Sequence, residues 1–140
     1  MRLWPILILC LSLPVVAKPM RAPSLDEGLR RATPVVAEFV DYEGDGIDYF
    51  TGAVARYKVL HRPTGQGPAV GSLIRVRYAF QDGSACLPEQ GWKFSPGMMP
   101  AARSRWILLL EGEQEPWNTY RGDFGRLPAT PENLTRVSTP

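Results

Sequence analysis

The chain of 140 residues is poor in the side chains that most often carry chemistry. It has two cysteines and a single histidine, His61. A zinc site usually takes three or four protein ligands, and a hydrolase needs a nucleophile held beside its base. The sequence therefore predicts no metal site, no cofactor and no enzymatic activity. A small hydrolase that uses His61 is kept as an alternative.

An excess of charge of one sign is also lacking. The chain has 16 Lys and Arg against 14 Asp and Glu, which gives a formal net charge of +2. Nucleic acids and anionic membranes are usually bound by strongly basic surfaces. The charge balance therefore predicts neither of them as a partner.

No hydrophobic run is long enough for a membrane span. The apolar residues 3–16 are interrupted by two prolines and are fewer than the roughly 20 that cross a bilayer. They follow Met1 and Arg2 and end in small residues at Ala17, the parts of a secretory signal peptide. We predict that residues 1–17 are removed, that the mature chain begins at Lys18, and that it is periplasmic or secreted and not membrane-spanning.

Cleavage leaves one cysteine in the mature chain, because Cys10 falls within the signal peptide. Cys86 then has no internal partner, and no disulfide can form within the chain. A small, partly buried thiol is one interpretation of Cys86. A reactive thiol, or one that pairs between two chains, is the other.

Five short segments of the mature chain have strand patterns. Residues 18–33 are polar, with one weak helix signal at Ser24 and Glu27 that is followed at once by Gly28, and we expect a flexible leader there. Alternating or unbroken apolar residues then predict strands. These predicted strands span residues 34–42, 49–60, 73–80, 106–110 and 120–124.

The strands predict an all-β fold in a single domain, residues 34–140. The glycines and prolines of residues 81–100 predict a long loop between the third and fourth strands. Five short strands suit a small barrel, because closure removes exposed sheet edges. Thr130, Pro131 and Glu132 stand in the order of a capped helix start. We predict a five-stranded OB-like barrel with a short C-terminal helix.

Several segments resemble small secreted bacterial proteins with a netrin/TIMP-like OB fold. They are PVVAEFVDYE, ARYKVLHRP, GSLIRVRYAF, the loop SACLPEQ, and the turn from Phe94 to Gly97 before WILLLEGE. In the animal inhibitors of that fold, an N-terminal cysteine engages the metal of a protease. The predicted mature start, Lys18-Pro19-Met20, has no cysteine. The resemblance therefore implies the fold and not this inhibition.

Four cations supply the candidate binding site. Arg56, Lys58, Arg75 and Arg77 oppose the apolar positions of the second and third strands, so they should share the outer side of that sheet. Strands two and three are where OB barrels commonly bind ligands. We predict an anionic glycan, lipid headgroup or acidic protein as the ligand. The face has no interleaved aromatic residues for stacking single-stranded nucleic acid.

An acidic segment and a set of aromatic residues leave alternatives open. Asp41, Glu43 and Asp45 alternate before Gly46, and Asp48 follows it, somewhat like the start of a calcium loop. Gly52 stands where such a loop has its closing glutamate, and a solvated hairpin turn is the other interpretation. Four large aromatic residues indicate either a sugar platform or core packing. These residues are Trp92, Phe94, Trp106 and Trp117.

The features together predict an exported, non-enzymatic binding or interaction module of the cell envelope. We expect a monomer whose partner is an envelope protein or an anionic ligand. The first alternative is an inhibitor of a protease or hydrolase that inserts its leader or a loop into the partner. The second alternative is the hydrolase that uses His61.

Overall fold

The structure, a computed structural model, describes residues 22–80 and 87–138, and most of its regular structure is β. The elements in chain order are α1 (Leu25–Arg31), β1 (Thr33–Asp48), β2 (Gly52–His61), β3 (Leu73–Tyr78), the 3-10 turn η1 (Pro96–Met98), β4 (Arg105–Glu111), β5 (Asn118–Thr119), the 3-10 turn η2 (Gly122–Gly125), β6 (Arg126–Pro128) and α2 (Pro131–Ser138). The predicted signal peptide and the predicted thiol at Cys86 lie outside the described residues.

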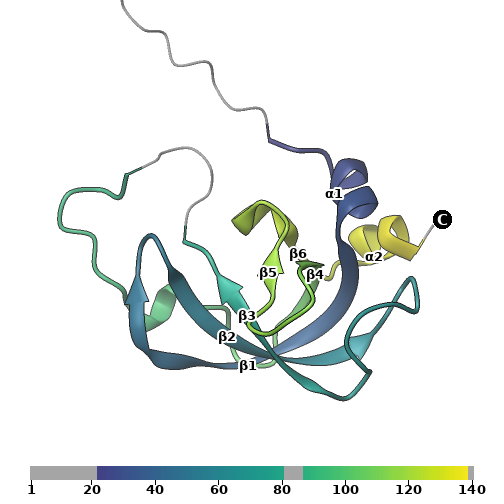
Figure 1. The fold of residues 1–140 in the computed structure, drawn as a ribbon, viewed down its shortest axis with the longest axis horizontal. Coiled ribbons are helices and arrows are strands. Elements are labelled where there is room, and N and C mark those ends of the chain that lie inside the picture. Colours follow the sequence, from purple (N-terminus) through teal and green to yellow (C-terminus); the bar gives the residue numbers. More distant parts are fainter. Residues whose placement is uncertain (1–21, 81–86, 139–140) are drawn as a thin grey trace, which may run out of the picture.

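The six strands form one antiparallel sheet that is strongly bent (Figure 1). Its order is β3-β2-β1-β4-β5, and β6 also pairs with β4. The edge strand β3 meets the other edge at a single parallel bridge between Val76 and Trp117, just before β5. Since no continuous ladder joins these edges in the described part of the chain, the sheet is open. The five-stranded closed barrel that the sequence predicts is therefore corrected to six strands in an open sheet.

The larger apolar core lies on the inner side of the bent sheet. Alternate residues of β2, among them Ala55, Tyr57 and Val59, are buried there, as the period of two predicts. Ile74 and Val76 of β3 extend the same layer. Burial of apolar surface of this kind is the main favourable contribution to folding.

Strand β4 is central and is buried on both sides, as its unbroken apolar run predicts. Leu108 and Leu110 face the inner core, while Ile107 and Leu109 belong to a second, smaller cluster. Helices α1 and α2 lie near each other on the outer side of this part of the sheet (Figure 1). Because the helices cover the outer side, a strand without polar alternation is stable here.

Helix α1 forms within the segment expected to be a flexible leader. The Ser24 side chain accepts a hydrogen bond from the Glu27 backbone N–H at 3.2 Å, which caps the helix. Gly28, which follows the weak helix signal directly in the sequence, packs against β4. A Cβ at this position would lie 2.7 Å from Leu109 Cδ1 and 3.2 Å from the Tyr120 ring. Glycine is used here for close approach, so residues 25–31 form a helix packed on the sheet where a flexible leader was expected.

The C-terminal helix agrees with the sequence. The Thr130 hydroxyl accepts a hydrogen bond from the Asn133 N–H at 3.3 Å, and Pro131 is the first residue of α2. Val137 is buried in the cluster beneath the helix. The capping pattern is therefore confirmed.

The first hairpin turns later than predicted. Strand β1 continues through the glycines at 44 and 46, with an irregular register between Glu43 and Asp48. The turn is built by Asp48, whose Oδ1 accepts hydrogen bonds from the backbone N–H groups of Phe50 (2.7 Å) and Thr51 (2.8 Å). The Asp48 carboxylate satisfies two backbone donors, so the turn forms after this residue and not at the glycines.

The prediction of a fifth strand at residues 120–124 is wrong. Arg121 has a left-handed backbone (φ 47°), and η2 follows it. Pairing occurs on either side instead, in β5 before this turn and in β6 after it. Each of these strands has two or three residues, too few for a period of two to reveal them.

Candidate functional site

The four predicted cations lie on the outer side of β2 and β3. Arg56 stands directly opposite Arg75, and Lys58 and Arg77 occupy positions of the same parity. The alternate residues of both strands are buried in the inner core. The predicted placement of these side chains on one face is therefore confirmed, whereas their role in binding stays a prediction.

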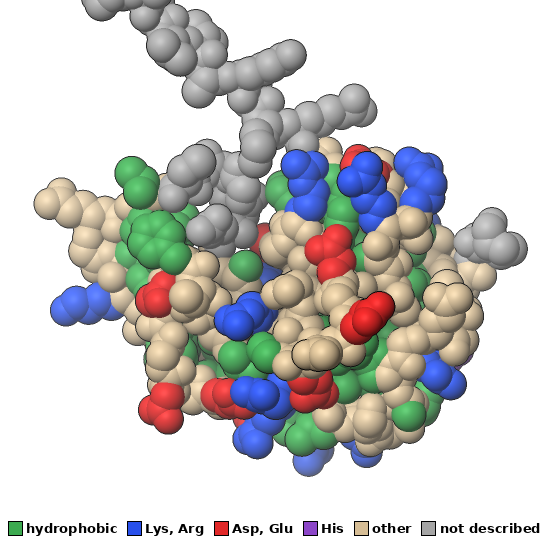
Figure 2. All heavy atoms as spheres, in the orientation of Figure 1, with side chains coloured by type: hydrophobic (Ala, Val, Ile, Leu, Met, Phe, Trp, Pro, Cys, Tyr) green, Lys and Arg blue, Asp and Glu red, His purple; other side chains and the backbone are tan. Residues whose placement is uncertain are grey.

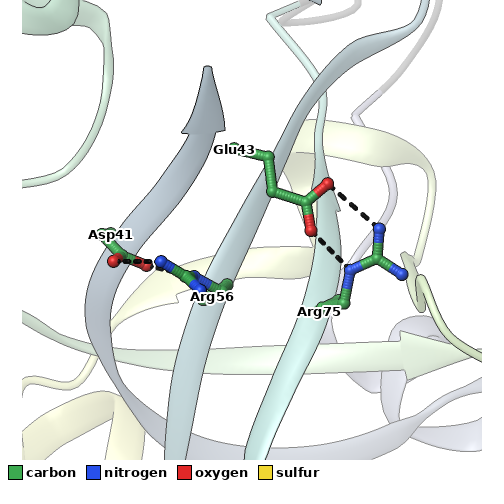
Figure 3. A network of polar contacts seen from close by, with 4 residues as sticks. All are labelled: Asp41, Glu43, Arg56 and Arg75. Atoms are coloured by element: carbon green, nitrogen blue, oxygen red, sulfur yellow. Dashed lines mark hydrogen bonds and ion pairs between the residues drawn. The ribbon is translucent and has the colours of Figure 1, made fainter. Parts of the chain in front are cut away.

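Strand β1 supplies acidic partners that the sequence analysis assigned to a turn (Figure 3). Asp41 is the register partner of Arg56 and accepts hydrogen bonds from its Nε (2.5 Å) and its Nη2. Glu43 accepts two hydrogen bonds from Arg75, from Nε at 2.6 Å and from Nη2 at 3.0 Å. Both contacts are bidentate, the strongest form of an arginine–carboxylate pair.

These pairs turn the predicted cationic patch into a face of mixed charge. The hydrogen bond from Arg75, with the positive charges of Arg75 and Arg56, lowers the pKa of Glu43. The pKa of Arg56 is raised, chiefly by its hydrogen bond to Asp41. Figure 2 shows Lys and Arg side chains beside Asp and Glu side chains along the lower edge of the molecule. An anion would meet carboxylates here as well as cations.

A fifth cation, absent from the sequence analysis, lies on the inner side of the sheet. Arg126 of β6 stands opposite Leu108 of β4, and cross-strand partners share a face of a sheet. Only 5% of its side chain is exposed. The register thus places a guanidinium at the rim of the apolar core.

Three contacts hold the Arg126 guanidinium. Its Nη2 donates to the Ala79 carbonyl at 3.0 Å and also to the Asp123 carboxylate. The guanidinium carbon lies 3.6 Å from the centre of the Tyr78 ring, a cation–π contact. The other terminal nitrogen, Nη1, is buried and has no hydrogen-bond partner among the described residues. A buried donor without a partner is costly and calls for an explanation.

A cavity of about 360 Å³ lies beside this guanidinium. We call it the Arg126 pocket, and its lining residues are Tyr78, Ala79, Phe80, Trp92, Met98, Asp123 and Arg126. The Phe80 ring contacts Tyr78 at 5.7 Å and Trp92 at 5.4 Å between ring centres. The pocket thus joins an aromatic wall to one cation and one carboxylate, the composition of many ligand sites.

Tyr57 extends the polar part of the inner side. Its hydroxyl is buried and has no hydrogen-bond partner within the described part of the chain. Burial raises the pKa of Tyr57, while the positive charge of Arg126 acts in the opposite direction. Tyr57 therefore stays protonated at neutral pH and is a donor, not an anion.

Sequence reasoning missed Arg126 because its strand is three residues long. An arginine between a glycine and a leucine gives no periodic signal. The one local hint is Asp123, which lies three residues earlier in the short η2 turn and forms the ion pair. Trp92 is one of the four aromatic residues for which the sequence indicates a sugar platform or core packing. The structure places it in the lining of the Arg126 pocket.

The remaining sequence candidates do not meet at the Arg126 pocket. His61 is exposed at the end of β2, opposite Val36. The acidic segment is engaged by Arg56, Arg75 and the turn at Asp48. Within residues 22–80 and 87–138, no group of three or more His, Cys, Asp or Glu side chains is placed to hold a metal ion. In the same residues, no helix combines the length and the apolar character of a membrane span.

No protein-family model, curated protein or solved structure matches the chain.

Proposed function

We propose that the protein is an exported, non-enzymatic binding module of the cell envelope, and that its ligand occupies the Arg126 pocket. The observation that carries the proposal is the cavity itself, in which an aromatic wall of Tyr78, Phe80 and Trp92 meets the side chains of Arg126 and Asp123. Export rests on the signal-peptide pattern of residues 1–17.

A structural role for Arg126 accounts for only part of its contacts. Nη2 ties β6 to the chain after β3 through the Ala79 carbonyl. A lysine could make that tie with one ammonium group. The fork of an arginine adds a second nitrogen, and planar, multiple donors are the feature for which arginine is used at binding sites.

Binding is favoured over catalysis by the chemistry of the pocket. Its charged side chains are Arg126 and Asp123, which form an ion pair, and Tyr78 is its other titratable side chain. An arginine is always charged and cannot exchange protons at neutral pH, so the pair makes a poor general acid or base. The inhibitor and the His61 hydrolase remain the alternatives, and no contact of the described residues favours either of them.

The fold supports a ligand site of this kind. We propose that the bent sheet is a partly open OB-like barrel, a form that this fold commonly takes. The bridge between Val76 and Trp117 brings its edges together at one point. The Arg126 pocket lies at the end of β3, away from the ion-paired outer face.

A ligand-observed NMR screen of small aromatic and polar fragments tests this proposal. The mature chain, residues 18–140, is compared with Arg126→Lys and with a control, Arg105→Lys, which changes an exposed arginine on β4. We expect bound fragments that are lost in Arg126→Lys and retained in the control. Fragments that bind both variants equally, or no bound fragment, would contradict the proposal.

A further inference from the structure

We infer that the ligand of the Arg126 pocket is a neutral sugar ring. The inference rests on the proposed function, because it assigns a chemical class to the same pocket. Three properties of the lining residues support it: their compensated charge, their pairing of a donor with an acceptor, and their aromatic wall.

The charge of the pocket is compensated before a ligand arrives. Arg126 is ion-paired with Asp123, and both side chains line the cavity. An anionic ligand in this cavity would gain from the guanidinium but lose to the carboxylate, which is the more exposed of the two side chains (43% against 5%). A neutral ligand does not meet this opposition.

A hydroxyl group fits the two polar side chains better than any single-function group. Arg126 lines the pocket with its guanidinium, and Asp123, whose side chain is 43% exposed, offers acceptor oxygens. A hydroxyl both accepts and donates, whereas a carboxylate only accepts. A ring with neighbouring hydroxyls can therefore use Arg126 and Asp123 together.

The rest of the pocket is apolar and aromatic. Tyr78, Phe80 and Trp92 form its wall, and Met98 adds to it. The C–H groups of a sugar ring pack on aromatic rings, while its hydroxyls point to the rim. A volume of about 360 Å³ is near the lower end for ligand pockets, so it suits one ring and not a large ligand.

Replacement of Asp123 provides the sharpest test. Saturation-transfer NMR on the mature chain is carried out with the methyl glycosides of glucose, galactose, mannose and N-acetylglucosamine, and with glucuronate as the acidic counterpart. We expect at least one neutral glycoside to bind wild type in preference to glucuronate. Asp123→Asn should weaken binding of that glycoside by about tenfold, because a hydrogen bond to a carboxylate is replaced by a weaker one to a neutral amide. The same substitution should strengthen the binding of glucuronate, because the positive charge of Arg126 is then uncompensated.

Two further variants locate the binding. Trp92→Ala should abolish glycoside binding, since it removes part of the aromatic wall, and circular dichroism checks that the variant folds. Val70→Ala, an exposed apolar residue outside the pocket lining, is the matched control and should bind as wild type does. A glycoside that binds Trp92→Ala and Asp123→Asn unchanged would overturn the inference.

The outcomes separate this inference from the proposed function. Arg126-dependent binding of glucuronate or of screen fragments, with no neutral glycoside bound, overturns the sugar and leaves the binding module. The absence of any Arg126-dependent ligand overturns both.

Discussion

Arg75 and Arg126 each form an ion pair with a carboxylate, yet they occupy opposite sides of the same sheet. The Arg75 side chain is 43% exposed and belongs to a mixed-charge outer face, whereas that of Arg126 is 5% exposed. Water can replace either partner of the outer pair, so such pairs contribute little to stability. Water cannot reach Arg126 in the same way, and every bond it lacks has a cost.

The difference shows where a charged residue indicates function. A cation on an exposed face with a carboxylate opposite it is expected of a soluble sheet. A guanidinium on the apolar side, in contact with Tyr78 and with one nitrogen unpaired, is costly to keep there. The inner side of the sheet therefore carries the stronger functional signal, although the outer face has more charges.

Leu108→Ala should have the largest effect on stability, and it measures how much a buried side chain on the inner side contributes. Leu108 is fully buried between Val35 of β1 and Arg126 of β6. We expect a loss of about 2–5 kcal/mol in the free energy of unfolding, measured by urea denaturation. Val40→Ala, at an exposed residue of β1, should change it by less than about 0.5 kcal/mol. A similar loss in both variants would remove the distinction between the two sides.

Arg126→Met comes next and tests the inner ion pair itself. Methionine keeps much of the apolar stem but leaves the Ala79 carbonyl without its side-chain donor. We expect a loss of about 1–3 kcal/mol from the unpaired carbonyl and the lost Tyr78 contact, partly offset because methionine also removes the unpaired Nη1. Arg75→Met should lower the urea midpoint far less. An equal drop in the two variants would mean that burial of the arginine does not matter.

Gly28→Ala extends the comparison to the apolar cluster beneath the helices. Alanine should favour helix α1 by up to about 1 kcal/mol, but its Cβ would lie 2.7 Å from Leu109 Cδ1. Overpacking typically costs about 1–3 kcal/mol. We therefore expect a net loss of about 1 kcal/mol in the free energy of unfolding, measured by thermal denaturation. Gly44→Ala, where a Cβ meets nothing within 4 Å, is the matched control. A gain in stability at Gly28 would show that α1 is held loosely.

The sequence predicts the parts of the fold that rest on local periodicity. Strands β2, β3 and β4 and the cap of α2 follow from alternation, an apolar run and a capping residue. What it could not predict depends on contacts between distant residues. Asp41 and Glu43 looked like a turn because their partners lie on β2 and β3. Arg126 gave no pattern because its burial comes from Tyr78 and Ala79, more than forty residues away.

The smallest expected effect concerns the outer face and its response to acid. The hydrogen bond from Arg75 lowers the pKa of Glu43 below its ordinary value of 4.5. A carboxyl whose pKa is lower in the folded state stabilises the fold above its unfolded pKa, and this contribution is lost as pH falls through the folded pKa. The stabilisation by Glu43 should therefore be fully present at neutral pH. It should be lost only as the pH drops below about 4.5.

Glu43→Gln isolates this contribution, because glutamine cannot titrate. The urea midpoint of the variant should fall less steeply than that of wild type between pH 5 and pH 3, and 1 M salt should narrow the difference by screening. Glu113→Gln, at an exposed carboxylate outside these pairs, serves as the control and should follow wild type. If Glu43→Gln and wild type lose stability in parallel, the outer pairs do not respond to acid as their geometry indicates, and the contrast with Arg126 becomes larger still.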